Sequence, residues 1–331
     1  MPEPRGAAGV ALVITVLDER HSIDALLASI AAQTRPPDEL IVVDGGSRDG
    51  TSEALVCWQT RLPLRVLTAP DASIGRGRNL GIEASSNPLI AVTDAGVRLD
   101  PHWLERLLAC LTDEVDVVAG FFVADPCTLF ETALGATTLP NLDDLRPERF
   151  LPSSRSILFR RAAWTAVGGY PEWLDYCEDL VFDLALKAHG ARFAFAPDAI
   201  VHFRPRPSLD AFARQYFRYA RGDGKADLWR ARHAIRYTTY LIALGLLALG
   251  WRRSAPWVLV PLLGGALAHT YAPYRRLSHQ LSGRPLAEVV AAILLVPALR
   301  ALGDVAKMLG YPVGVAWRRR RAPVRTPAAL G

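Results

Sequence analysis

Short apolar runs alternate with amphipathic segments through the first 95 residues, and this alternation constrains the fold more than any other feature. The apolar runs cover 10–17, 40–43, 64–67 and 89–93, and apolar residues at helical spacing fill 18–32, 52–58 and 76–84. Strands alternating with helices at this interval predict an α/β fold with a mostly parallel sheet and helices on both faces. Ligands of such sheets bind at the carboxyl ends of the strands, so polar residues there are the first candidates for a site.

The middle of the chain continues with less regular patterns. We expect a loop over 140–152, helices over 161–167, 179–189 and 210–221, and a strand over 192–196. Half of the 331 residues are hydrophobic, which excludes a disordered chain and leaves ample material for a core. Together these patterns predict one α/β domain over 1–235.

The last third of the chain changes to long uncharged stretches. Residues 237–251 and 254–274 carry no charged side chain. A helix needs ~20 residues to cross the hydrocarbon core of a bilayer. We therefore expect two membrane-spanning helices, at about 237–251 and 255–274.

A third apolar stretch, 289–299, is shorter and is interrupted by Pro297. Beyond it, Arg300, Asp304 and Lys307 share one helical face, a pattern typical of a helix that lies in the membrane interface. We predict such an interfacial helix at about 286–309, within a membrane region that covers 236–317 and precedes a basic tail over 318–331.

Charge and cysteine usage indicate the compartment and the partners. Residues 1–200 hold 17 basic and 28 acidic side chains, whereas 201–331 hold 21 basic and five acidic. Basic clusters beside apolar runs favour an anionic membrane over nucleic acid as the partner. Arginines concentrate on the cytosolic side of membranes, which predicts a cell-membrane protein whose first domain faces the cytoplasm. The four widely spaced cysteines match neither a disulfide framework nor a zinc site, and we expect them to be reduced.

The segment 41–51, Ile-Val-Val-Asp-Gly-Gly-Ser-Arg-Asp-Gly-Thr, is the most informative motif. Asp44 ends a predicted strand, and the glycines after it let a planar ligand approach the backbone closely. The alternative is that Asp44 only caps the turn that follows it. Four further motifs follow this segment along the chain. They are Gly-Arg-Asn-Leu-Gly-Ile at 77–82, Thr-Asp-Ala-Gly-Val-Arg-Leu-Asp-Pro at 93–101, Tyr-Cys-Glu-Asp-Leu at 176–180 and Arg-Gln-Tyr-Phe-Arg-Tyr-Ala-Arg-Gly at 214–222.

With the opening strand and turn at 13–19, these motifs resemble the family 2 glycosyltransferases, which have a GT-A fold. The segment 214–222 is similar to that of the succinoglycan-type glucosyltransferases. The resemblance implies Asp179 as the catalytic base beside Glu178, and direct displacement with inversion at the sugar. It also implies a set of residues that contact the nucleotide-sugar donor: Thr15, Val16, Glu19, Asp44, Ser47, Arg76, Arg78, Asn79, Gln215, Arg218 and Arg221.

Some of these assignments have alternatives. Asp179 could instead cap the helix that begins there, in which case Glu178 would be the base. Gln215, Arg218 and Arg221 recur every three residues, so they could equally form a solvated or lipid-headgroup face of their helix.

The metal-binding segment of the resemblance departs from the family pattern. The family motif has a second aspartate, whereas this chain has Asp94-Ala95-Gly96. We expect a divalent cation, Mg²⁺ or Mn²⁺, held by Asp94, diphosphate oxygens, water and His202, because Mg²⁺ binds largely through phosphate. His202 is equally compatible with a structural role.

The resulting hypothesis is a membrane-associated transferase. It moves a sugar from a nucleoside diphosphate, expected to be UDP, to a hydroxyl of a lipid-linked saccharide in exopolysaccharide or cell-envelope glycan synthesis. One alternative keeps the fold but makes polyprenyl phosphate the acceptor, as in dolichol-phosphate mannose synthase-like enzymes. The incomplete metal motif motivates another, a non-catalytic membrane protein that binds a nucleotide sugar.

Overall fold

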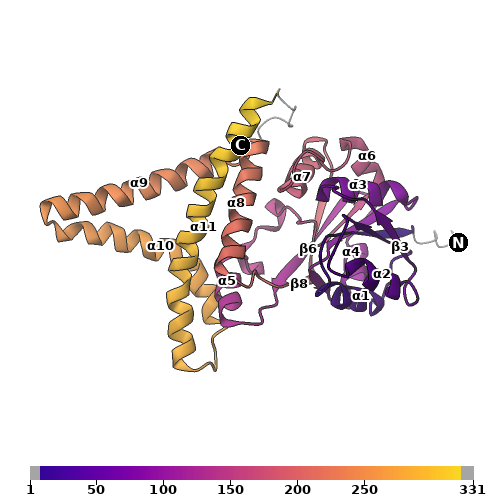
Figure 1. The fold of residues 1–331 in the computed structure, drawn as a ribbon, viewed down its shortest axis with the longest axis horizontal. Helices are drawn as coiled ribbons and strands as arrows, with labels where there is room; N and C mark the ends of the chain where they lie inside the picture. The colour runs from indigo at the N-terminus through magenta and orange to yellow at the C-terminus, as the bar shows by residue number, and fades with distance from the viewer. Residues whose placement is uncertain (1–7, 322–331) are drawn as a thin grey trace. The chain divides into compact units, whose positions relative to one another are not determined.

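The computed structural model describes residues 8–321, so the predicted basic tail beyond residue 321 lies outside the described residues. The chain divides into two compact units (Figure 1). The first contains the residues up to Val123 together with Leu142–Arg204, and the second contains Ala124–Asn141 and the residues from Pro205 onward. This division differs from the predicted boundary near residue 235.

An eight-stranded sheet forms the centre of the first unit, in the order β3-β2-β1-β4-β7-β6-β8-β5. The strands are β1 Val10–Val16, β2 Glu39–Asp44, β3 Leu64–Thr68, β4 Leu89–Asp94, β5 Val97–Leu99, β6 Val117–Ala124, β7 Ile157–Arg160 and β8 Phe193–Phe203. Neighbours among β1–β4 pair in parallel, whereas β7 pairs antiparallel with β4 and β6, and β5 with β8. The α/β prediction is confirmed, although the sheet is mixed beyond β4.

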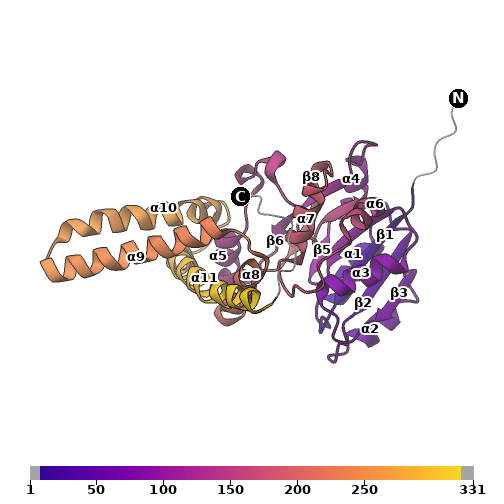
Figure 2. The same cartoon turned by 90° about the horizontal axis from the view of Figure 1, so that it is seen from above.

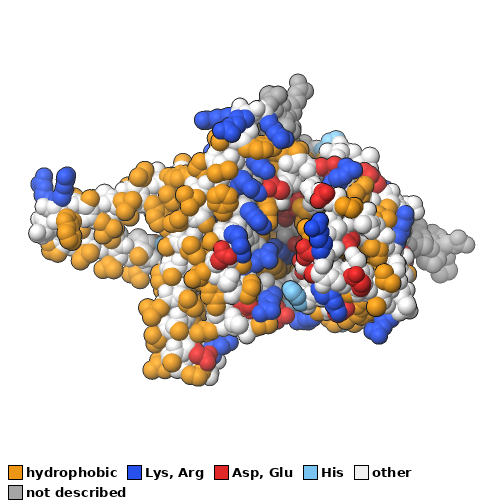
Figure 3. Space-filling view, in the orientation of Figure 1, with side chains coloured by type: hydrophobic (Ala, Val, Ile, Leu, Met, Phe, Trp, Pro, Cys, Tyr) orange, Lys and Arg blue, Asp and Glu red, His pale blue; other side chains and the backbone are white. Residues whose placement is uncertain are grey.

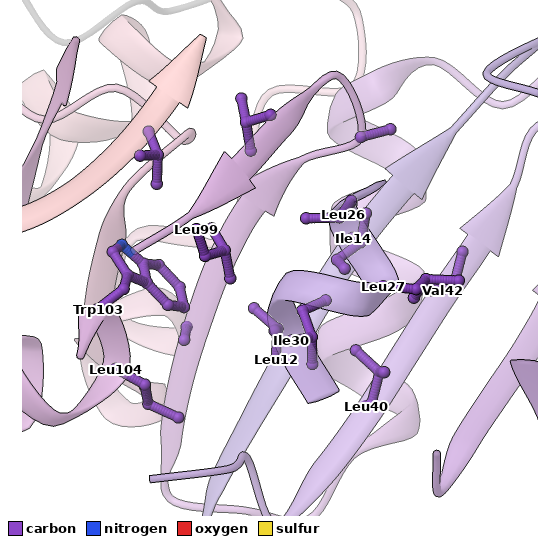
Figure 4. Packing of buried hydrophobic residues seen from close by; sticks show 14 of the residues in the cluster. Leu12, Ile14, Leu26, Leu27, Ile30, Leu40, Val42, Leu99, Trp103 and Leu104 are labelled. Carbon is purple, nitrogen blue, oxygen red and sulfur yellow. The ribbon is translucent and has the colours of Figure 1, made fainter. Parts of the chain in front are cut away.

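Helices cover both faces of this sheet (Figure 2). They are α1 Ile23–Ala31, α2 Thr51–Trp58, α3 Ile74–Ala84, α4 Trp103–Ala109, α6 Arg161–Val167 and α7 Glu178–Ala188. Strand β1 is buried on both sides, as expected for a strand between two helical layers. Leu12 and Ile14 join α1 and Trp103 in one core (Figure 4). Val13, from the other face of β1, packs with Ile82 of α3 and Phe182 of α7.

Helices make up the second unit: α5 Leu129–Thr138, α8 Leu209–Ala226, α9 Arg230–Arg253, α10 Leu259–Ser278 and α11 Leu286–Arg320. Helices α5 and α8 fall inside the predicted domain 1–235 but pack with α11 instead. The reason is a shared apolar core of Leu134, Phe212 and Leu299, one residue from each of the three helices.

Two helices, α9 and α11, are long and apolar enough to cross a membrane by length and composition. The apolar window of α9 contains no buried residue, whereas a third of the window in α11 is buried inside the protein. Helix α9 contains the first predicted span. Helix α10 overlaps the second but is not one of the two candidate spans among the described residues, whereas α11, predicted to lie in the membrane interface, is one of them. Helix α11 continues past Pro297 and past the predicted end at 309, to Arg320. Figure 3 shows hydrophobic side chains over the hairpin of α9 and α10. The number of spans stays a prediction.

Helices α8 and α11 approach each other at the level of their backbones. A Cβ atom on Gly310 would overlap the carbonyl oxygen of Phe217, and one on Gly314 would overlap that of Arg221. Glycines are therefore required at these two positions of α11, because any side chain would push the helices apart.

We predict that Gly310→Ala destabilises the protein by about 1–3 kcal/mol, the usual cost of overpacking a tight contact. Gly264→Ala is the matched control, since Gly264 is also helical but has open space where a side-chain carbon would stand. Thermal unfolding in detergent should show a lower midpoint only for Gly310→Ala. Equal midpoints for the two variants would contradict the close packing of α8 on α11.

Candidate active site

The loop after β2 is organised by the carboxylate of Asp44. Its Oδ1 accepts hydrogen bonds from the backbone N of Gly46 at 3.0 Å, and from the backbone N and Oγ of Ser47 at 2.9 and 2.8 Å. Its Oδ2 accepts one from the hydroxyl of Ser52. Burial opposes the charged form of Asp44, but these hydrogen bonds outweigh it and lower the pKa. Asp44 therefore caps the turn that follows it, as the alternative interpretation expected. Its contact with a ligand stays a prediction.

Strand register brings the predicted residues of three strands to one edge. Val16 lies opposite Asp44 in the ladder of β1 and β2, and Thr15 lies opposite Asp94 in the ladder of β1 and β4. The turn after β1 joins the same edge, because the backbone N of Glu19 donates to Oγ1 of Thr51 at 2.9 Å. The carboxyl edge of the parallel half thus gathers Thr15, Val16, Glu19, Asp44 and Asp94.

Arg78 of α3 is almost fully buried at this edge, with only 2% of its side chain exposed. Its Nη1 donates to Oε1 of Glu178 at 2.6 Å, and its Nη2 donates to Oδ1 of Asp94 at 2.8 Å. Burial alone would lower the pKa of Arg78, but the two carboxylates raise it. Burial raises the pKa of Glu178, and Arg78 opposes that shift.

A second arginine, Arg155, reaches the same carboxylate. Its Nε lies 3.4 Å from Oδ2 of Asp94, and its guanidinium lies 4.2 Å from the centre of the Phe203 ring. Sequence analysis missed Arg155 because β7, which follows it, was not predicted. The polar Pro-Ser-Ser-Arg-Ser stretch at 152–156 was the available signal.

The acidic pair, Glu178 and Asp179, lies in the first turn of α7. This helix begins at Glu178 after Cys177, whose φ of 67° is left-handed. Asp179 is therefore inside the helix, and the interpretation of Asp179 as its N-cap is wrong. Oδ1 of Asp179 accepts from the backbone N of Leu180 at 2.8 Å.

Asp183, one turn further along α7, was also missed by sequence analysis. It is 1% exposed, and its Oδ2 has no hydrogen-bond partner among the described residues. Burial, with the nearby charge of Asp179, raises the pKa of Asp183 well above its ordinary value. Its spacing of four from Asp179 was the only signal in the sequence.

Arg76 and Asn79 also lie on α3 but have different surroundings. Arg76 is exposed and pairs with Glu172 at 3.2 Å. Asn79 is buried, and its amide exchanges hydrogen bonds with the backbone O and N of Tyr170, both at 2.9 Å. Asn79 therefore fastens the segment before α7 to α3, and its contact with a nucleotide stays a prediction.

The remaining predicted residues belong to β8 and α8. His202 is half-buried in β8, opposite Arg98 of β5. Gln215, Arg218 and Arg221 belong to α8 in the second unit, where Nε2 of Gln215 donates to the hydroxyl of Tyr219 at 2.7 Å. Their part in donor binding stays a prediction.

The donor set at Asp94 limits what metal the site can hold. Within residues 8–321, no three His, Cys, Asp or Glu side chains are gathered as metal ligands. Asp94 keeps free lone pairs beside its two arginines, and its side chain is 28% exposed. These residues fit a Mg²⁺-like cation that takes most of its ligands from a bound diphosphate and water.

Solved structures identify the fold. The mannosyltransferase PcManGT from Pyrobaculum calidifontis, in complex with GDP-Man and Mn²⁺, superposes with a TM-score of 0.55 at 18% identity, over 97% of this chain and 89% of its own. S. aureus TarS 1–349 in complex with UDP-GlcNAc superposes with a TM-score of 0.51 at 16% identity, over 96% and 93%. The sheet is thus that of a GT-A glycosyltransferase.

The family follows from the sequence matches. The model of glycosyl transferase family 2 matches residues 11–165, and that of glycosyl transferase family group 2 matches 89–299. Succinoglycan biosynthesis protein ExoA of Rhizobium meliloti is 29% identical over 86% of this chain and 90% of its own. Glycosyltransferase AglE of Haloferax volcanii is 27% identical over 72% and 80%. The chain belongs to the family 2 glycosyltransferases, as its motifs predicted, and is an enzyme that acts on nucleotide-sugar donors.

We predict that Arg78→Met lowers the free energy of unfolding by about 3–5 kcal/mol, because it leaves the buried carboxylate of Glu178 without its partner and removes one of the two arginines at Asp94. Arg76→Met, two residues earlier on the same helix, removes an exposed ion pair and should cost less than about 1 kcal/mol. Denaturant titrations of the two variants measure both losses. Similar losses would show that the Arg78 pairs contribute no more than a surface contact.

A pH prediction follows from Asp183. Its raised pKa means that the folded chain keeps a proton which the unfolded chain releases above pH ~4. Stability should therefore fall as pH rises from ~4 through the pKa of the folded state, and Asp183→Asn should remove that part of the slope. Thermal midpoints between pH ~4 and ~9 test this, and parallel curves for the two proteins would contradict it.

Proposed function

We propose that the protein transfers a sugar from a nucleoside diphosphate, with UDP as the nucleotide, to a hydroxyl of a lipid-linked saccharide in exopolysaccharide or cell-envelope glycan synthesis. The observation that carries the proposal is the joining of α3, β4 and α7 by Arg78. This residue donates to Glu178, in the first turn of α7, and to Asp94, at the sheet edge that also holds the Asp44 loop. These contacts support a candidate nucleotide loop and a candidate diphosphate position at one edge, with the candidate base next to Glu178 in the chain.

The proposed reaction is a single displacement. The carboxylate of Asp179 takes the proton of the acceptor hydroxyl, whose oxygen bonds to the anomeric carbon from the face opposite the leaving group. The bond from that carbon to the diphosphate oxygen breaks, and the nucleoside diphosphate leaves with the electron pair. An α-linked donor then gives a β-linked product.

The leaving diphosphate needs positive charge near it. Arg76 is exposed at the start of α3 and is held by a single surface ion pair, so it can turn to a phosphate at little cost. A divalent cation shared between Asp94 and the diphosphate would neutralise the developing charge. The Mn²⁺ in the mannosyltransferase complex supports this cofactor by analogy.

The membrane part of the proposal rests on the second unit. Helices α9 and α11 meet the length and composition of membrane spans, and the hairpin of α9 and α10 exposes leucines such as Leu241, Leu244 and Leu263. A polyprenyl-carried saccharide stays at the bilayer, so its transferase has to reach it there. The similarity to ExoA, a succinoglycan biosynthesis protein, supports an envelope or exopolysaccharide product. We propose that the first unit faces the cytoplasm.

We expect Asp179→Asn to lower turnover by about 10²–10⁴-fold, the usual contribution of a general base, and to leave UDP binding nearly unchanged. Asp113→Asn makes the same chemical change at an exposed position and serves as the control. The measurements are calorimetric titration with UDP in Mn²⁺ or in chelator, and transfer from UDP-sugars to membrane lipid extracts.

Three results would count against parts of the proposal. Unchanged turnover would remove Asp179 as the base. Binding without turnover in the wild type would favour the non-catalytic alternative. A product that mild acid cleaves at a phosphate would make polyprenyl phosphate the acceptor.

A further inference from the structure

The carboxylate of Asp94 carries an arginine on each of its two oxygens. Nη2 of Arg78 donates to Oδ1 at 2.8 Å, and Nε of Arg155 lies 3.4 Å from Oδ2. A divalent cation that binds Asp94 has to approach one of these oxygens. Positive groups that lie close together repel each other strongly, so a cation and an arginine on the same oxygen compete for the carboxylate.

Arg78 is held too firmly to give way to a cation. Only 2% of its side chain is exposed, and it also donates to Glu178 at 2.6 Å. If it left Asp94, a buried guanidinium would lose one of its two carboxylate partners, which is costly. We therefore expect Oδ1 of Asp94 to stay with Arg78 when a ligand binds.

Arg155 makes the longer contact with Asp94 and is more exposed, at 16% of its side chain. Its backbone is fixed, because its carbonyl oxygen accepts from Oγ1 of the buried Thr93 at 2.7 Å. The side chain can therefore turn about a stationary backbone, and it has the rotatable bonds to do so. Oδ2 of Asp94 is thus the oxygen that a cation can reach, at the expense of Arg155.

Two aromatic rings support the guanidinium of Arg155. It lies 4.2 Å from the ring centre of Phe203 and 5.5 Å from that of Phe122. Stacking engages the flat face of a guanidinium, whereas its N–H groups point outward along the edge and match the oxygens of a phosphate. Arg155 can therefore keep its aromatic contacts while its edge changes partner, from a carboxylate to a phosphate.

We propose that Arg155 is a binding residue for the donor diphosphate, and that it neutralises Asp94 until the cation arrives. When the cation and the nucleoside diphosphate bind, Arg155 leaves Oδ2 of Asp94 and turns to a phosphate oxygen. No covalent bond forms or breaks in this exchange. The proposal rests on the proposed function, because it takes the diphosphate and its cation as the ligands of this edge.

The test compares two affinities of the full chain in detergent, for the wild type and for Arg155→Met. In the first measurement the thermal midpoint is followed as Mn²⁺ is raised without nucleotide, because stabilisation by a ligand reports even weak binding. We expect the half-saturating Mn²⁺ concentration to fall about tenfold in the variant, since the competitor at Asp94 is gone. In the second, UDP is titrated by calorimetry in saturating Mn²⁺. We expect about tenfold weaker binding by the variant, since one charge-assisted hydrogen bond is lost.

Arg192→Met is the matched control. Arg192 directly precedes β8, so it lies at the end of that strand opposite to Phe203, and its side chain is 61% exposed. The substitution removes the same charge from the first unit, away from Asp94. Both affinities should stay at the wild-type value.

The proposal requires the two affinities of Arg155→Met to change in opposite directions. A fall in both would mean that Arg155 only holds the edge in shape, and no change, or a change in one alone, would mean that no exchange takes place. Arg155→Gln has the same expected results and decides the matter if Arg155→Met does not fold. Wild-type protein that binds no UDP would overturn the proposed nucleotide together with this proposal. UDP binding that both variants leave unchanged would overturn the role of Arg155 alone.

Discussion

The double ion pair of Arg78 is the interaction on which the first unit depends. A guanidinium that is almost fully buried must be satisfied by charged partners, so Glu178 and Asp94 have to meet it. Helix α3 can bring Arg78 to these carboxylates because its glycines lie against β1. A Cβ on Gly81 would overlap the side chain of Val13. Sequence-distant segments are thus fixed at one edge by one side chain.

Much of this edge could be predicted from the sequence, because parallel strands buried on both faces have a strong apolar signature. The runs that became β1 to β4 were recognised, and with them Asp44 and Asp94. In the antiparallel half, only the start of β8 was predicted, by the strand at 192–196. Strand β6, Val-Val-Ala-Gly-Phe-Phe-Val-Ala, was missed because it lies among short elements with no regular period. Arg155 was missed with it, because its place beside Asp94 depends on the antiparallel register of β7 against β4.

The helical unit shows a different limit of sequence reasoning. Periodicity placed Arg300, Asp304 and Lys307 on one face but could not say what that face would meet. Partners from other helices, Arg236 and His269, determine that Asp304 is covered, while its two neighbours meet no carboxylate within the described part of the chain. Likewise, Gly224 of α8 lies against the backbone of α11, but its place in the sequence does not indicate that partner, because glycines of that much later helix complete the contact.

The loop of Asp44 has a consequence for the kinetics of recognition. Its carboxylate holds the loop through hydrogen bonds made entirely within the chain, so the loop is ordered before the nucleotide of the proposed function would bind. A ligand that meets a preformed loop loses little free energy to ordering it. Association at this end of the sheet should therefore be a one-step encounter governed by diffusion and orientation, with selectivity expressed in how long each nucleotide stays.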